Sequence, residues 1–125
     1  MTNEEIRDAI KNAITEERVM LFMKGTPDAP SCGFSARMVG MLNALEVEYA
    51  ALDILPDPRI REELSAVSNW PTIPQLFVGG EFVGGCDIAT EMFESGELAT
   101  LMGAKQPEGV APEPQAQQPP PLQIQ

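Results

Sequence analysis

The chain has 125 residues, of which 43% are hydrophobic and 22% are charged, so it can form one ordinary domain with a packed core. Nineteen Asp and Glu against eight Lys and Arg give a net charge of −11, which disfavours non-specific binding to nucleic acid because phosphates would be repelled. There is no histidine, which excludes Ser-His-Asp and Cys-His catalysis and every histidine-based metal site.

The pattern along the chain predicts strands separated by helices, with one tight hairpin. The expected elements are a helix over 1–18, a buried strand over 19–23, a loop over 24–31, a helix from Cys32, a strand over 49–54, a helix carrying Ile60, Leu64 and Val67, strands over 75–78 and 81–83, and helices over 88–95 and 98–102. Helices between strands indicate parallel crossovers, and a Gly79-Gly80 hairpin adds antiparallel strands. We therefore expect an α/β fold with a mixed sheet and helices on both faces.

Three local features support these assignments. Thr2 and Glu5 have the spacing of a capping box at the start of the first helix. In the helix from Cys32, Phe34 is expected on the same apolar face as Met38, Met41, Leu42 and Leu45. Trp70, Phe77 and Phe82 are interpreted as core and hairpin packing.

Residues 1–103 are expected to form the domain, and residues 104–125 a tail. Six of the last nineteen residues are Pro and five are Gln, a composition that favours a disordered segment with polyproline II character. The tail could be a peptide ligand for another domain, although a solvated tail is the favoured interpretation.

The start of the chain and the cysteine count favour a cytoplasmic location. Residues 1–5 are polar and acidic, without the basic region and apolar run of an export signal. The longest purely apolar run, residues 19–23, is far short of the roughly 20 residues that cross a bilayer. Two cysteines do not make a disulfide-rich secreted scaffold.

Cys32 is the candidate reactive residue because it lies at the expected start of a helix. Unpaired backbone N–H groups and the positive end of the helix dipole favour a thiolate there, and Lys24 and Arg37 could add positive charge. The alternative is that Cys32 is a small buried hydrophobic residue. The small, polar neighbours Ser31 and Ser35 are interpreted as unsuited to a packed core, which favours an accessible sulfur.

Cys32 lacks the second cysteine of a Cys-x-x-Cys motif, because Ser35 occupies that position. Any disulfide that it forms must therefore involve Cys86, a small thiol cofactor or another chain. Cys32 could instead be a metal ligand, but one or two cysteines without histidine cannot complete a four-ligand site. A thiolate-ligated cluster would need sulfurs from a second subunit or a bound thiol.

Four motifs carry a family resemblance: Lys24-Gly25-Thr26-Pro27, Cys32-Gly33-Phe34-Ser35, Trp70-Pro71-Thr72-Ile73-Pro74-Gln75 and Gly84-Gly85-Cys86-Asp87. In this order and spacing, over roughly residues 3–103, the chain resembles the single-domain monothiol, CGFS-type glutaredoxins. The resemblance implies a thioredoxin-like fold, with a mixed four-stranded sheet flanked by helices, and bound glutathione. It also implies a 2Fe–2S cluster held between two subunits by Cys32 and one glutathione from each, and transfer of that cluster to recipient proteins, often with BolA-like partners.

The resemblance also implies residues for glutathione binding. Lys24 and Arg61 match the positions that hold its glycine carboxylate. Pro74 matches a cis-proline, before which Ile73 offers its backbone N–H and C=O groups. Cys86 and Asp87 open a helix whose N–H groups suit the γ-glutamyl carboxylate, and Asp87 is expected to cap that helix.

Three functions remain as hypotheses. The first is a carrier of the iron–sulfur cluster as a homodimer. The second is a glutathione-dependent thiol–disulfide oxidoreductase with Cys32 as the catalytic nucleophile. The resemblance links the longer segment between Lys24 and Cys32 to weak activity of that kind. The third is a non-catalytic adaptor acting through the Pro-rich tail. Cys86 is interpreted as a small residue whose main chain binds ligand rather than as a catalytic residue, with a Cys32–Cys86 disulfide as a minor hypothesis.

Overall fold

The computed structural model describes residues 1–107, and the predicted tail lies outside the described residues from residue 108 onward. The helices and strands follow the order α1 (Asn3–Glu16), β1 (Val19–Met23), β2 (Gly25–Thr26), β3 (Ala29–Pro30), α2 (Gly33–Ala44), β4 (Ala50–Asp53), α3 (Pro58–Ser68), β5 (Gln75–Val78), β6 (Glu81–Gly84), α4 (Cys86–Ser95) and α5 (Glu97–Met102). Each predicted helix and strand is found within a few residues of its expected ends. The one addition is the short β2–β3 hairpin, which forms inside the segment that was predicted as a loop.

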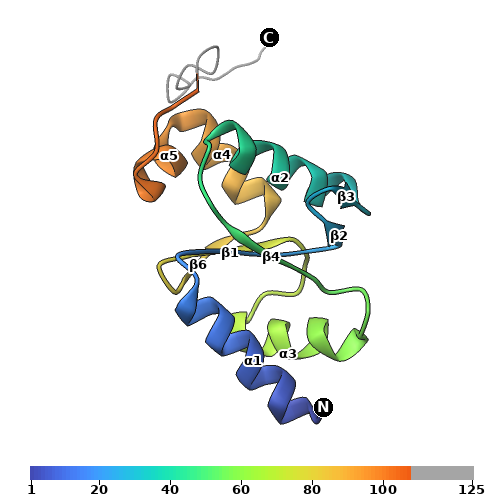
Figure 1. The fold of residues 1–125 in the computed structure, drawn as a ribbon. Coiled ribbons are helices and arrows are strands. Elements are labelled where there is room, and N and C mark those ends of the chain that lie inside the picture. The colour runs from blue at the N-terminus through green and yellow to red at the C-terminus, as the bar shows by residue number, and fades with distance from the viewer. Residues whose placement is uncertain (108–125) are drawn as a thin grey trace.

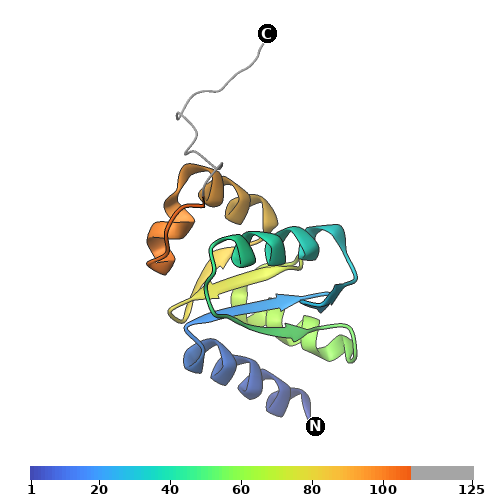
Figure 2. The same cartoon turned by 45° about the horizontal axis from the view of Figure 1, so that its top comes forward.

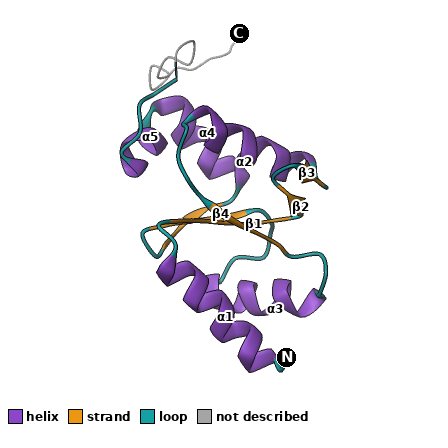
Figure 3. Ribbon diagram, viewed as in Figure 1, coloured by secondary structure: helices purple, strands orange, loops and turns teal. Residues whose placement is uncertain are grey.

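A four-stranded mixed sheet is the centre of the fold, with the strand order β4-β1-β5-β6. β1 is parallel to β4 and antiparallel to β5, and β6 is antiparallel to β5. Helices α1 and α3 cover one face of this sheet, and α2 and α4 cover the other, with α5 beside α4 (Figures 1 and 3). The predicted mixed sheet with helices on both faces is therefore confirmed.

β1 is buried along its whole length because both faces of the sheet are covered. Its alternate side chains enter two separate cores: Val19, Leu21 and Met23 pack with α2, α4 and α5, whereas Met20 and Phe22 pack with α1 and α3. This explains why its sequence is a continuous apolar run instead of an alternating one.

Two turn and cap signals in the sequence act as expected. Gly79 and Gly80 have φ values of 62° and 84°, and these positive angles suit the tight turn that joins β5 to β6. The Thr2 hydroxyl accepts a hydrogen bond from the Glu5 amide, and the Glu5 carboxylate accepts one from the Thr2 amide, which completes the capping box of α1.

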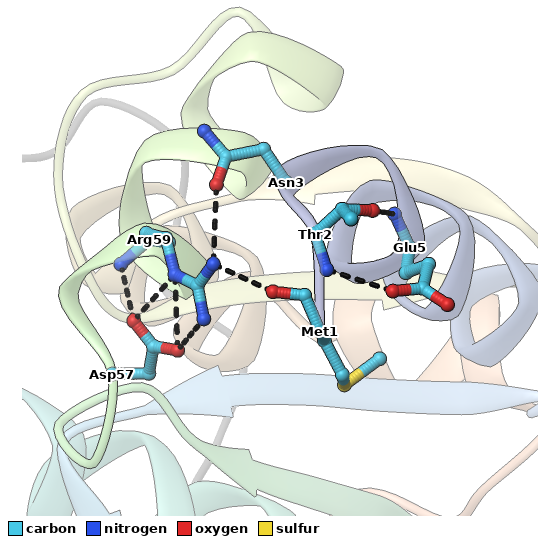
Figure 4. A network of polar contacts seen from close by, with 6 residues as sticks. All are labelled: Met1, Thr2, Asn3, Glu5, Asp57 and Arg59. Carbon is cyan, nitrogen blue, oxygen red and sulfur yellow. Dashed lines mark hydrogen bonds and ion pairs between the residues drawn. The ribbon is translucent and has the colours of Figure 1, made fainter.

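A polar network ties the start of α1 to the start of α3 (Figure 4). Asp57 caps α3 by accepting a hydrogen bond from the Arg59 amide, and it pairs with the Arg59 guanidinium at 2.8 Å. The same guanidinium donates to the Met1 carbonyl at 2.7 Å. The Arg59 guanidinium holds the pKa of Asp57 below its usual value, mainly by hydrogen bonding to the carboxylate. Further along, Arg7 of α1 pairs with Glu63 of α3, so the two helices are joined at two places.

Candidate functional site

The strand register brings the candidate residues to one edge of the sheet. Three pairs of facing residues fix the ends of the strands there: Met23 with Asp53, Phe22 with Gln75, and Leu76 with Gly84. The segments that follow β1, β4 and β6, and the segment that precedes β5, therefore emerge at the same edge. Figure 2 shows the β2–β3 hairpin and the start of α3 at this end.

Cys32 is the N-cap residue of α2, with extended backbone angles, and it is partly exposed. Backbone N–H groups of Ser35 and Phe34 lower the pKa of its thiol, with a further contribution from the Lys24 ammonium. These are the effects expected at a helix N-terminus beside a cation. The predicted position at the start of a helix is thus confirmed, and the alternative of a fully buried Cys32 is wrong.

Ser35 corrects one sequence interpretation, because it is fully buried and not an exposed polar neighbour. Its hydroxyl accepts a hydrogen bond from the Lys24 amide at 3.1 Å, which ties the first turn of α2 to the end of β1. A small hydroxyl residue is suited to this position because the one polar atom of its side chain has a hydrogen-bond partner.

Asp53 supports the same edge from the end of β4. One carboxylate oxygen accepts hydrogen bonds from the amides of Gly25 and Leu55, each at 2.9 Å. The loop after β1 and the loop after β4 are therefore held to a single side chain. Sequence reasoning did not identify this role, because Gly25 and Asp53 are 28 residues apart in the chain.

The segment before β5 has the cis Ile73–Pro74 bond that the resemblance implied. Ile73 is buried, at 7% exposure. Arg61, an exposed residue of α3, donates from Nη2 to the Pro71 carbonyl at 3.3 Å. Arg61 is therefore held beside the backbone that leads to Ile73. Gln75, at the start of β5, bonds to the same segment, which the sequence analysis also missed.

The N-terminus of α4 differs from expectation in one detail. Its N-cap is Gly85, which provides no side-chain cap, and Asp87 lies exposed in the first turn. Asp87 therefore does not cap the helix, because the helix already begins at Cys86. The Cys86 side chain is buried at 7% exposure, with its sulfur 3.9 Å from the Thr90 hydroxyl oxygen. Both thiols are free, and Cys32 is the more accessible.

Two aromatic residues near this edge are more exposed than predicted. Phe34 is 61% exposed and lies outside the buried face of α2, which begins at the next residue, Ser35. Trp70 is 36% exposed, and its ring contacts Phe82 with centroids 5.6 Å apart. Packing against the hairpin is confirmed for Trp70, but full burial is not.

No group of three or more Cys, Asp or Glu side chains in residues 1–107 is placed to hold a metal ion. None of the helices described is both long enough and apolar enough to span a membrane. A hollow of about 970 Å³ lies at the opposite end of the sheet, between the segment before β1, the end of α2 and the segment after α5. It contains neither cysteine, so the chemistry of the candidate site lies elsewhere.

The strand order, a thiol at the start of the helix after β1, and the cis-proline before β5 define a thioredoxin-like protein. A glutaredoxin family model matches residues 19–83. Over 98 residues the chain is 55% identical to "Glutaredoxin 4" of Pasteurella multocida, covering 78% of this chain and 90% of that protein. Over 102 residues it is 48% identical to "Probable monothiol glutaredoxin 2" of Rickettsia felis, covering 82% and 98%.

A solved structure agrees with this result. The solution structure of a monomeric truncated mutant of Trypanosoma brucei 1-C-Grx1 superposes with a TM-score of 0.70 and 45% identity, covering 84% of this chain and 94% of that one. The chain belongs to the glutaredoxin family. Its single motif thiol, Cys32, with Ser35 in the second position, places it with the monothiol members.

Proposed function

We propose that this protein binds glutathione at the edge described above and carries a 2Fe–2S cluster, as cargo, between two of its subunits. The observation that carries this proposal is Cys32, the only partly exposed thiol among residues 1–107. Its pKa is lowered, which favours the thiolate, and the thiolate is the form that binds iron. Transfer of the cargo to recipient proteins in iron–sulfur biogenesis, in the cytoplasm and with a BolA-like partner, belongs to the same proposal.

The arrangement of the candidate residues supports glutathione as the ligand. Lys24 lies close enough to the Cys32 sulfur to lower its pKa, and Arg61 lies beside the backbone before Ile73. These two cations suit the glycine carboxylate, while the Ile73 backbone suits the extended peptide of glutathione. The first turn of α4, at Cys86 and Asp87, has no side-chain cap, so its N–H groups are suited to the γ-glutamyl carboxylate.

The number of thiols available as cluster ligands supports a site shared by two chains. A 2Fe–2S cluster is held by four ligands, typically thiolates. The described chain provides one accessible thiol, since the Cys86 sulfur is buried. Two Cys32 thiolates from two subunits, with the thiols of two glutathione molecules, complete the set. The residues present therefore fit such a cluster only at an interface.

Anaerobic reconstitution with iron, sulfide and glutathione tests the proposal. The wild-type protein should become coloured and elute as a dimer on gel filtration, and omitting glutathione should prevent both changes. Cys32→Ser should remain colourless, whereas Cys86→Ser, which changes a buried thiol, is the matched control and should still load. A Cys32→Ser protein that takes up a normal cluster would refute the assignment.

A second candidate function, deglutathionylation, is favoured by the same lowered thiol pKa. The Cys32 thiolate would attack the glutathione sulfur of a mixed disulfide on a protein, so that the protein thiolate leaves and takes a proton. A second glutathione would then attack the Cys32–glutathione disulfide, releasing Cys32 and forming oxidised glutathione. A reductase-coupled assay discriminates the two functions: strong turnover favours the enzyme, and weak turnover with cluster uptake favours the carrier.

A further inference from the structure

Gln75 is an unusual residue for its position, because it is a fully buried polar side chain in a central strand of the sheet. It begins β5, which lies between β1 and β6. Burying an amide is costly unless the amide is hydrogen-bonded, so an apolar residue would be the simpler choice at this position. A specific role for the amide group would explain its presence.

The Gln75 amide nitrogen donates to two backbone carbonyls of the preceding segment. The acceptors are the carbonyl oxygens of Trp70 and Thr72, each 3.0 Å from Nε2. The other amide atom, Oε1, is buried and has no partner among residues 1–107. The orientation of the amide is therefore determined, because the reverse orientation would place Oε1 against two carbonyl oxygens. Both donors of the side chain are used to hold the segment from Trp70 to Thr72.

This segment lies between the groups assigned to glutathione. On one side, Arg61 donates to the Pro71 carbonyl. On the other side is Gly85, which precedes the first turn of α4. A Cβ atom built on Gly85 would lie 3.3 Å from the Trp70 indole nitrogen and 3.4 Å from the Pro74 carbonyl oxygen. A shift of the segment would therefore alter its fit against both Arg61 and the start of α4.

We propose that Gln75 is a positioning residue for glutathione. It acts through the segment from Trp70 to Thr72, which it holds so that the Ile73 backbone, Arg61 and the N-terminus of α4 face the ligand together. This inference rests on the proposed function, because the ligand is the glutathione of that proposal. The structure gives the Gln75 side chain no other hydrogen-bond partner in the part of the chain that it describes.

Three variants separate positioning from simple packing. Gln75→Met keeps the length of the side chain but has no donor, and Gln75→Asn keeps the amide but is too short by one methylene. Leu76→Ala is the matched control, because Leu76 is the next residue, is equally buried, and packs in the core on the α2 face of the sheet. The control destabilises the domain without removing either hydrogen bond to the segment.

Titration calorimetry with reduced glutathione measures binding to the full chain at a temperature where every variant is folded. We expect Gln75→Met to raise the Kd for glutathione about tenfold, since two neutral hydrogen bonds no longer hold the segment. Gln75→Asn should also weaken binding, and it decides the question if Gln75→Met does not fold. Leu76→Ala should keep the Kd within about twofold of wild type despite a lower unfolding midpoint.

Trp70 gives a second readout, because it is the only tryptophan of the chain and lies in the segment that Gln75 holds. Its fluorescence without ligand should change in both Gln75 variants and stay unchanged in Leu76→Ala. Wild-type affinity in both Gln75 variants, or a loss of affinity in Leu76→Ala that follows its loss of stability, would overturn the inference alone. A wild-type protein that does not bind glutathione would overturn the proposed function as well.

Discussion

Replacing Gly25 with alanine should destabilise the domain in the segment between β1 and Cys32. Gly25 begins the β2–β3 hairpin, with a φ of +86°. A Cβ atom there would lie 2.5 Å from the Ala29 carbonyl oxygen and 2.6 Å from the Ser31 amide nitrogen. Both are backbone atoms of the opposite strand or its continuation, so no side-chain rotation relieves the contacts.

The magnitude follows from two terms. A left-handed conformation costs an L-residue about 1–2 kcal/mol, and forcing extra atoms into a packed site typically costs about 1–3 kcal/mol. Alanine recovers a part of this by restricting the unfolded chain, about 0.4–1 kcal/mol. We therefore expect Gly25→Ala to lower the free energy of unfolding by about 2–4 kcal/mol.

Urea denaturation followed by far-ultraviolet circular dichroism measures this change, with Gly40→Ala as the matched control. Gly40 is exposed within α2, and a Cβ atom there would have no neighbour within 4 Å. Alanine in a helix interior should raise the free energy of unfolding by about 0.5–1 kcal/mol, the opposite sign to Gly25→Ala. If Gly25→Ala unfolds at the wild-type urea concentration, the hairpin does not have the geometry described.

Three further predictions concern charge and capping. In apo protein carrying Cys86→Ser, alkylation of Cys32 should reach half its maximum rate below the usual cysteine pKa of about 8.5, because the folded pKa is lowered. The thiolate then stabilises the fold fully above about pH 8.5, and this contribution disappears as the pH falls through the pKa of Cys32 in the folded protein. A half-maximal alkylation rate at or above about pH 8.5 would contradict the lowered pKa of Cys32. Thr2→Ala should lower the free energy of unfolding by about 1 kcal/mol in urea titrations, through loss of the cap. Arg7→Met should lower the urea midpoint more than Glu63→Gln does, since it leaves a carboxylate with 9% exposure unpaired. Equal effects would show that the unpaired Glu63 carboxylate carries no extra cost.

The sequence was sufficient for elements whose signals are local. The apolar run Val19–Met23 predicts β1 because covering both faces of a sheet removes the usual alternation. The hairpin follows from Gly79 and Gly80, since adjacent glycines readily adopt the positive φ values of its turn. Cys32 could be placed at a helix start because the preceding segment, with its prolines, excludes a helix there.

The errors arose where burial depends on contacts between distant segments. Helical periodicity places Phe34 near the apolar face of α2, but it cannot show which residues of the first turn are covered, and Phe34 is exposed whereas Ser35 is buried. The same lack of information made Ser35 look exposed, although it lies beneath the end of β1 and bonds to Lys24. Asp87 was taken as a cap because the start of α4 was placed two residues too late, and helix boundaries are rarely fixed to within one or two residues.

The candidate site depends on polar contacts that fix three segments at one sheet edge. Ser35 fixes the loop after β1, Asp53 joins that loop to the one after β4, and Gln75 fixes the segment before β5. In each contact a side chain bonds to a backbone group. Because almost every residue type can provide that group, the identity of the partner residue gives no signal in the sequence. The residues that would touch glutathione can therefore be inferred from motifs, whereas the residues that hold them in place are found only from the structure.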